Sequence, residues 1–262
     1  MKIGVMGAMP QEIQHLISGI RNPRKHESGK REFVEGKLHD NEVVAVFSRW
    51  GKVAASSTAT TLIERFGVEL IIFAGVAGAL DRALNIGDIV VASRLVQHDM
   101  DASAIPGVER FEIPLLGVPF FEPPADMVTK AEEASKIYLD IHMREDLSPD
   151  TLDYFGISAP KVVTGLVASG DQFIASDAVT EELCRALPEL KCVEMEGAAV
   201  AQVAYEHNIP FVVLRTISDK ADHSAAVDFP AFVERVASNF TFGCVSQLLR
   251  MLSGNNISDP HA

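Results

Sequence analysis

Two carboxylates, Glu194 and Glu196, flank Met195 in the segment 192–201, where an extended stretch should give way to a helix. The segment reads CVEMEGAAVA, and its small residues at 197–199 allow that helix to pack closely against its neighbours. Burying two acids in such an apolar setting costs free energy unless hydrogen-bond donors meet them. The conflict between the acids and their surroundings therefore indicates a site for a ligand that carries hydroxyl donors.

Other polar residues follow predicted strands at several points of the chain. Glu12 comes after the first strand, Ser169 and Asp171 come after a later one, and Asp219 follows the last. The glycine-rich sequence AGVAG at 74–78 ends a further strand. In open α/β sheets, ligands bind beyond the carboxyl ends of the strands. Each residue alone is typical of a helix cap or a turn, but together they predict a binding site at one edge of the sheet.

Apolar periodicity and turn residues divide the chain into alternating strands and helices. Strands are expected at 2–6, 32–38, 42–48, 70–74, 88–96, 161–168 and 210–217. Helices are expected at 11–20, 53–66, 124–143, 177–187, 197–207 and 229–252, with Asp177 capping its helix, and loops at 21–31 and 98–124. The alternation predicts a single α/β domain over residues 1–252, with a central mixed, mostly parallel β-sheet flanked by helices, and a polar tail at 253–262.

Composition narrows the kind of partner. The chain has 262 residues, a formal net charge of −13 and no lysine- or arginine-rich run. This acidity argues against nucleic acid or an anionic membrane surface as the partner. No apolar run approaches the ~18 residues of a membrane span. The three cysteines have no metal-binding spacing, and their small number suits a reducing cytoplasm. The composition predicts a soluble cytoplasmic protein that acts on a small molecule.

Five motifs resemble those of the 5'-methylthioadenosine/S-adenosylhomocysteine nucleosidases, a family of the nucleoside phosphorylase superfamily. They are MKIGVMGAMPQE at 1–12, AGVAG at 74–78, SGDQFI at 169–174, VEMEGAA at 193–199 and RTISDKAD at 215–222. They occur in the family's order and span the chain to about residue 250. The resemblance implies hydrolysis of the N-glycosidic bond between adenine and ribose in 5'-substituted adenine nucleosides. It also implies a homodimer that uses no metal and no organic cofactor.

The resemblance assigns roles to particular residues. Glu12 would activate the attacking water, and Asp219 would protonate adenine at N7 as it leaves. Glu196 would hold the ribose hydroxyls with help from Met195, and Phe173 would stack on adenine. The remaining substrate-site candidates are Met9, Gly78, the backbone of Ile174, Glu194 as a support or side contact of the sugar, and Arg215 and Ser218 near the water and the acid.

These roles agree with the chemistry of the bond. Its cleavage builds positive charge on the ribose and negative charge on the purine, so a carboxylate near the sugar and a proton donor at the base lower the barrier. The arrangement follows the logic of inverting glycosidases, with acid and base on opposite faces of the sugar. Asp219 can act as an acid near neutral pH only if its pKa is raised, which burial and the neighbouring charges of Glu12 and Glu196 would cause.

Two features depart from the family pattern. Val76 stands where the close family usually has serine, which removes a hydroxyl near the expected water. The segment 98–124 is longer than in the shorter members of the family, and its Phe111 is a candidate to line the 5' pocket of a neighbouring subunit. Phe229 or Phe232 is a candidate to cover the 5' substituent, whereas Trp50 is assigned to the core or an interface.

Other functions fit the sequence less well. A purine nucleoside phosphorylase would share the fold, but it needs cationic groups or a glycine-rich cradle for phosphate. Glu12 would repel phosphate, and no arginine precedes Arg21. A non-catalytic nucleoside-binding protein would not need Glu12, Glu196 and Asp219 together. An aminofutalosine-type nucleosidase stays open, because the methylthio, homocysteinyl, deoxy and futalosine-type substituents would all leave the adenine and ribose contacts unchanged.

Overall fold

Unbroken apolar runs form the centre of the sheet. The computed structural model describes residues 1–222 and 225–254, and most of the predicted tail at 253–262 lies outside these ranges. β5 (Leu70–Ala79) and β10 (Phe211–Asp219) are buried at every residue, and β1 (Lys2–Gly7) is buried at every residue except its first. β5 pairs in parallel with both β1 and β10. Strands buried in this way are covered on both faces, which is why their sequences show no alternation.

The remaining strands complete a mixed sheet. They are β2 (Arg21–Ser28), β3 (Arg31–Leu38), β4 (Asn41–Phe47), β6 (Ile89–Gln97), β7 (Phe120–Phe121), β8 (Val162–Ser169) and β9 (Leu190–Glu194). The strand order is β10-β6-β8-β9-β5-β1-β4-β3-β2, and β7 pairs with β6. Because β10 also pairs with β5, the strands β5, β10, β6, β8 and β9 close into a ring. This arrangement confirms the predicted single α/β domain with a mixed sheet; antiparallel pairs occur at the β2–β3–β4 edge, at β7 and where β10 meets β6 and β5 meets β9.

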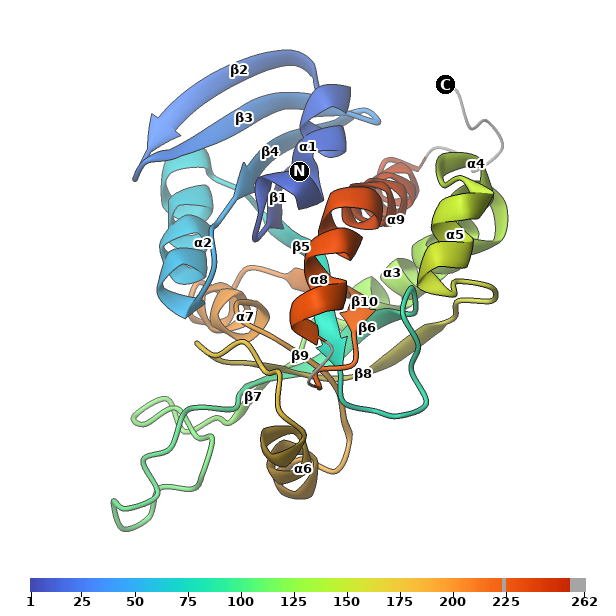
Figure 1. Ribbon diagram of the computed structural model, residues 1–262. Coiled ribbons are helices and arrows are strands. Elements are labelled where there is room, and N and C mark those ends of the chain that lie inside the picture. The colour runs from blue at the N-terminus through green and yellow to red at the C-terminus, as the bar shows by residue number, and fades with distance from the viewer. Residues whose placement is uncertain (223–224, 255–262) are drawn as a thin grey trace.

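Helices cover both sides of this sheet (Figure 1). They are α1 (Pro10–Gly19), α2 (Lys52–Phe66), α3 (Ala125–Ile137), α4 (Met143–Asp146), α5 (Pro149–Phe155), α6 (Asp177–Ala186), α7 (Gly197–Glu206), α8 (Ala225–Phe232) and α9 (Ser238–Leu252), with π-helical turns η1 (Tyr138–His142) and η2 (Val233–Ala237). α9 packs against α1 and α3, whereas α2 packs against α7 on the other side. In the described ranges, no helix is long and apolar enough to span a membrane.

The register brings the polar strand ends together. Ser169 at the end of β8 lies opposite Glu194 at the end of β9, and Asp219 at the end of β10 lies opposite Gly78 of β5. Gly78 in turn lies opposite Val193 of β9. The carboxyl ends of these strands therefore meet at one place, as the sequence predicted.

Some expectations about local structure are wrong. The segment 21–31, predicted as a loop, contains strand β2, whose residues are mostly exposed because it forms the edge of the sheet. The long helix predicted at 229–252 begins at Ala225 and is interrupted by η2. Asp177 is the first residue of α6, and Ser176 occupies the capping position instead. The short helix α5 was not predicted. The segment 98–124 is irregular, as expected, apart from β7 and one bridge between Ile113 and Val118.

Candidate active site

Glu12 is held by backbone N–H groups at the turn between β1 and α1. Its Oε2 accepts hydrogen bonds from the N–H groups of Ala8 (2.6 Å) and Met9 (2.9 Å), and its Oε1 accepts one from Val76 (3.1 Å). The side chain is only 1% exposed. Burial raises the pKa of Glu12, while the charge of Arg215 and the three N–H groups oppose the rise. The result is a fixed, desolvated carboxyl group whose proton affinity exceeds that of an ordinary glutamate.

The AGVAG segment gives this carboxyl group the room it needs. A Cβ on Gly75 would lie 2.6 Å from Glu12 Oε1, so a side chain at this position would displace the acid. Val76 donates to Glu12 through its main chain, which any residue other than proline can do. The valine that replaces the family's usual serine therefore keeps this contact.

Asp219 ends β10 and is fixed by its own local turn. The N–H of Ala221 donates to its Oδ1 and the hydroxyl of Ser218 donates to its Oδ2, each at 2.8 Å. Asp219 is 2% exposed, and a Cβ on Gly78 would lie 2.8 Å from its Oδ1. The second glycine of AGVAG thus makes room for Asp219 as the first does for Glu12.

Glu194 and Arg215 form a buried ion pair at the wall of the pocket. Arg215 Nη2 lies 2.7 Å and its Nε 3.2 Å from Glu194 Oε2. The guanidinium group also lies over the ring of Phe73, 4.1 Å from its centroid. Glu194 further accepts hydrogen bonds from the N–H groups of Glu196 and Gly197 and from the hydroxyl of Ser169. These contacts hold Glu194 in place, and its side chain also lines the pocket.

Glu196 lies at the N-terminal end of α7 and has a different environment. Its Oε1 accepts a hydrogen bond from the N–H of Gly51 at 2.7 Å, and the side chain lines the pocket. Burial, followed by the neighbouring charge of Glu194, raises the pKa of Glu196 to about 8. Gly51 was not anticipated from the sequence, because a backbone donor in a loop leaves no trace in residue type.

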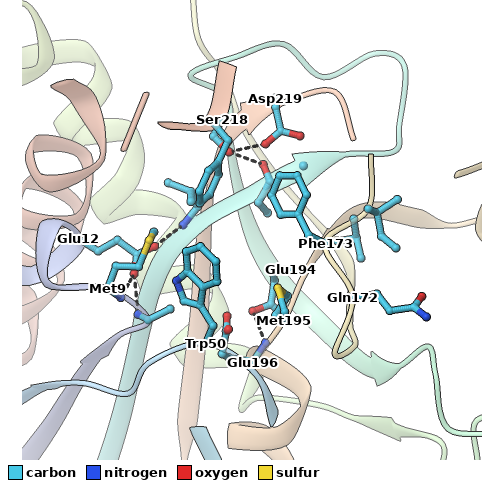
Figure 2. A pocket seen from close by; sticks show the side chains of 17 residues that line it. Met9, Glu12, Trp50, Gln172, Phe173, Glu194, Met195, Glu196, Ser218 and Asp219 are labelled. Carbon is cyan, nitrogen blue, oxygen red and sulfur yellow. Dashed lines mark hydrogen bonds between the residues drawn. The ribbon is translucent and has the colours of Figure 1, made fainter. Parts of the chain in front are cut away.

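These groups surround one open pocket with an empty volume of about 550 Å³ (Figure 2). Glu12 and Asp219 lie at separate points of its wall, and Glu194 and Glu196 lie together on a third side. Its lining residues are Ala8, Met9, Glu12, Trp50, Val76, Ala77, Gly78, Gln172, Phe173, Ile174, Val193, Glu194, Met195, Glu196, Ser218, Asp219 and Phe229. The catalytic and substrate-site residues that the resemblance assigned are all among them except Arg215, which is buried behind Glu194. Ser169 and Asp171, also expected at this edge of the sheet, do not line the pocket; they contact Glu194 and the N–H of Lys52 instead.

Three aromatic rings gather at the mouth of the pocket. Phe229 lies edge-on to Trp50 and to Phe173, with ring centroids 6.1 and 5.4 Å apart. Trp50 is 56% exposed and Phe173 44%. Trp50 therefore does not belong to the core, which was one of the two positions predicted for it; the other, an interface, stays a prediction.

Two other aromatic candidates lie elsewhere. Phe232 is fully buried in the core against Phe155 and Phe240, so it does not cover the pocket. Phe111 is 7% exposed and belongs to a buried cluster of its own chain that includes Ile174. Its side chain therefore packs within its own chain.

Comparison with known proteins identifies the family. Residues 2–250 match the model of the phosphorylase superfamily. A 5'-methylthioadenosine/S-adenosylhomocysteine nucleosidase of Shewanella halifaxensis is 34% identical over 96% of this chain and 100% of its own. The corresponding enzyme of Colwellia psychrerythraea, solved with adenine, is 34% identical with a TM-score of 0.84, covering 98% of both chains. A futalosine hydrolase of Helicobacter pylori is 34% identical with a TM-score of 0.79, covering 94% of this chain and 97% of its own.

The superfamily match and the similar proteins each cover nearly the whole chain. This chain therefore belongs to the 5'-methylthioadenosine/S-adenosylhomocysteine nucleosidases, which are N-glycosyl hydrolases of the phosphorylase superfamily.

Proposed function

We propose that this protein hydrolyses the N-glycosidic bond of 5'-substituted adenine nucleosides, 5'-methylthioadenosine and S-adenosylhomocysteine among them, and releases adenine. The observation that carries the proposal is one pocket lined by two buried carboxyl groups, Glu12 and Asp219, each fixed by its own hydrogen bonds. A third buried carboxyl group, that of Glu196, also lines this pocket and accepts a hydrogen bond from the backbone. Cleavage of this bond needs a base for water, an acid for the purine and a negative group near the developing ribose cation.

In this proposal Glu12 takes a proton from the attacking water. The N–H groups of Ala8 and Met9 hold one carboxylate oxygen and that of Val76 holds the other, so the group has a single orientation. The pKa of Glu12 is raised by burial, which makes the carboxylate a stronger base than an exposed glutamate. Water activated here would attack C1' from the side away from adenine.

Asp219 protonates N7 of adenine as the bond breaks. Ser218 and the N–H of Ala221 fix the carboxyl group, so it can face the base without rotating away. Phe173 and Ile174 follow one another on the loop that lines the pocket, where the ring of Phe173 can stack on adenine and the backbone of Ile174 can bond its edge. Glu196, with Met195 beside it, accepts hydrogen bonds from the ribose hydroxyls.

Hydrolysis is favoured over phosphorolysis by the charges in the pocket. The charged side chains among its described lining residues are Glu12, Glu194, Glu196 and Asp219, with no lysine, arginine or histidine. Arg215 is fully buried and its guanidinium group is held by Glu194. A phosphate dianion would therefore meet carboxylates without a cationic partner.

The substituent at the ribose 5' position distinguishes the second candidate function. The similar Helicobacter pylori protein that is named futalosine hydrolase makes aminofutalosine-type nucleosides the alternative substrates. The three aromatic rings at the pocket mouth, Trp50, Phe173 and Phe229, favour an apolar 5' group such as methylthio.

We also propose that the protein is a cytoplasmic homodimer, as the resemblance implies. Val53, at the start of α2 and close in sequence to Trp50, is 81% exposed, which suits contact with a second copy. Sedimentation velocity should give a mass of two chains; a single-chain mass at micromolar concentration would contradict the dimer.

Removal of either catalytic carboxylate should nearly abolish turnover. We expect Glu12→Gln and Asp219→Asn each to lower kcat by about 10²–10⁴-fold, because acid–base groups typically contribute this much. Adenine release is followed by chromatography, and circular dichroism checks that the fold is intact. Glu133→Gln, an exposed acid, serves as the matched control. Full activity in either active-site variant would refute the assignment.

Ligand binding at pH 7 should release a proton from Glu196. With a pKa of about 8, Glu196 is mostly protonated at pH 7 when no ligand is bound. Ribose hydroxyls that donate to the carboxylate favour its charged form and lower its pKa, so the proton leaves. Titration calorimetry in buffers of different ionisation enthalpy measures the number of protons released on binding. The ligand is a 7-deaza analogue of methylthioadenosine, which cannot be protonated at N7.

We expect release of about half to one proton per site in the wild type, and none of this release in Glu196→Gln. Proton uptake by the wild type, or equal release by both proteins, would contradict the proposed contact between Glu196 and the ribose.

Trp50 should affect catalysis in proportion to the size of the 5' group. The assay compares adenine release from methylthioadenosine, S-adenosylhomocysteine, 5'-deoxyadenosine and aminofutalosine. We expect methylthioadenosine to have the highest kcat/KM, and Trp50→Ala to lower it by about tenfold, as the loss of an apolar contact to the substituent does. The kcat/KM for 5'-deoxyadenosine should change little, because this nucleoside has no bulky 5' substituent. An equal loss for both nucleosides would show that Trp50 does not contact the 5' group.

A further inference from the structure

Three loops at the pocket mouth are tied together by side chains that do not line the pocket. Lys52 Nζ lies 2.6 Å from Asp99 Oδ1 and donates to Gln97 Oε1 at 3.0 Å. The N–H of Lys52 donates to Asp171 Oδ1 at 2.8 Å. The N–H of Asp171 donates to Asp99 Oδ2 at 2.9 Å. Lys52, Asp99 and Asp171 thus form a closed set of contacts, here called the loop bridge.

The loop bridge joins two parts of the pocket that the proposed function assigns to different parts of the substrate. Lys52 follows Trp50, which lines the pocket, and Gly51, whose N–H donates to Glu196. Asp171 precedes Gln172 and Phe173, which line the adenine side. Glu196 belongs to the ribose side. The bridge therefore spans from the loop that holds the ribose carboxyl group to the loop that carries the stacking ring.

Close packing leaves this connection little freedom. Gly51 has φ +90°, and a Cβ there would lie 2.9 Å from Asp171 Oδ1, so the aspartate rests directly against the backbone that holds Glu196. The side chains of Lys52 and Asp99 are 17% and 25% exposed. Gln97 extends the contacts, because its Nε2 donates to Gln202 of α7 at 2.6 Å. α7 is the helix that begins beside Glu196.

Asp99 keeps its negative charge within the bridge. Partial burial alone would raise the pKa of Asp99, but the hydrogen bonds from Lys52 and from the N–H of Asp171 outweigh it and the pKa is lowered. Both oxygens of Asp99 accept hydrogen bonds from donors. An asparagine at this position would place its NH₂ group, a donor, against one of these two donors, so one hydrogen bond would be lost along with the charge.

We infer that Lys52, Asp99 and Asp171 are positioning residues that set the spacing between the ribose side and the adenine side of the pocket. This inference rests on the proposed function. A nucleoside occupies both sides and depends on their spacing, whereas adenine alone occupies one. Breaking the bridge should therefore weaken binding of the nucleoside but leave binding of adenine unchanged. Because the bridge acts on substrate and transition state alike, KM should change more than kcat.

The test compares Asp99→Asn, Lys52→Met and Lys52→Arg with wild-type protein. For Asp99→Asn and Lys52→Met we expect KM for methylthioadenosine to rise about tenfold with kcat changed by less than about twofold. The inhibition constant of adenine should stay within about twofold. Lys52→Arg keeps the cation and should restore most of the affinity. Titration calorimetry with the 7-deaza analogue and with adenine measures the same two affinities without turnover.

Asp81→Asn is the matched control. Asp81 forms an ion pair with Lys191 at the same distance, 2.6 Å, with side chains 27% and 32% exposed, and neither residue lines the pocket. It should leave both affinities unchanged.

The inference is overturned if Asp99→Asn and Lys52→Met bind the nucleoside as the wild type does. It is equally overturned if the affinity for adenine falls by the same factor, or if Asp81→Asn has the same effect, since either result indicates general loosening. A wild-type protein that binds the analogue but releases no adenine would instead refute the proposed function, while the two calorimetric affinities would still decide the role of the bridge.

Discussion

The buried ion pair of Glu194 and Arg215 is the interaction on which the rest of the site depends. Removing two charges from water costs several kcal/mol each unless the partners and further hydrogen bonds compensate. Here Glu194 also accepts bonds from the N–H groups of Glu196 and Gly197 and from Ser169. The pair thereby links the ends of β8 and β9 and the middle of β10 to the start of α7. Losing either partner would leave an uncompensated buried charge beneath the pocket.

The same pair explains how several acids coexist in one apolar pocket. Arg215 supplies the positive charge that counters the burial of Glu12, and backbone N–H groups supply the remaining donors. Burial and the neighbouring charge of Glu194 raise the pKa of Glu196 to about 8. Two carboxyl groups separated by one residue therefore have different properties: Glu194 is committed to the ion pair, and Glu196 is available to a ligand.

The sequence predicted the parts of this protein that depend on apolar runs and strand ends. The strands predicted at 70–74 and 210–217 follow from unbroken apolar runs, although β5 extends to Ala79 and β10 to Asp219. The acids at 12, 196 and 219 could be selected because they end or follow such runs and match the motifs of the family. β2 was missed because an exposed edge strand needs no apolar alternation. Gly51 and the contacts of Lys52 were missed because main-chain donors and ion pairs between distant loops depend on tertiary structure alone.

In the proposed function, a nucleoside lies in the pocket with its glycosidic bond between Glu12 and Asp219. A crystal structure of Glu12→Gln with uncleaved methylthioadenosine tests it most directly. We expect N7 of adenine within about 2.6–3.2 Å of an Asp219 carboxyl oxygen, the ribose hydroxyls on Glu196, and C1' facing the side chain at position 12. A nucleoside bound with adenine away from Asp219, or with its ribose hydroxyls away from Glu196, would contradict it.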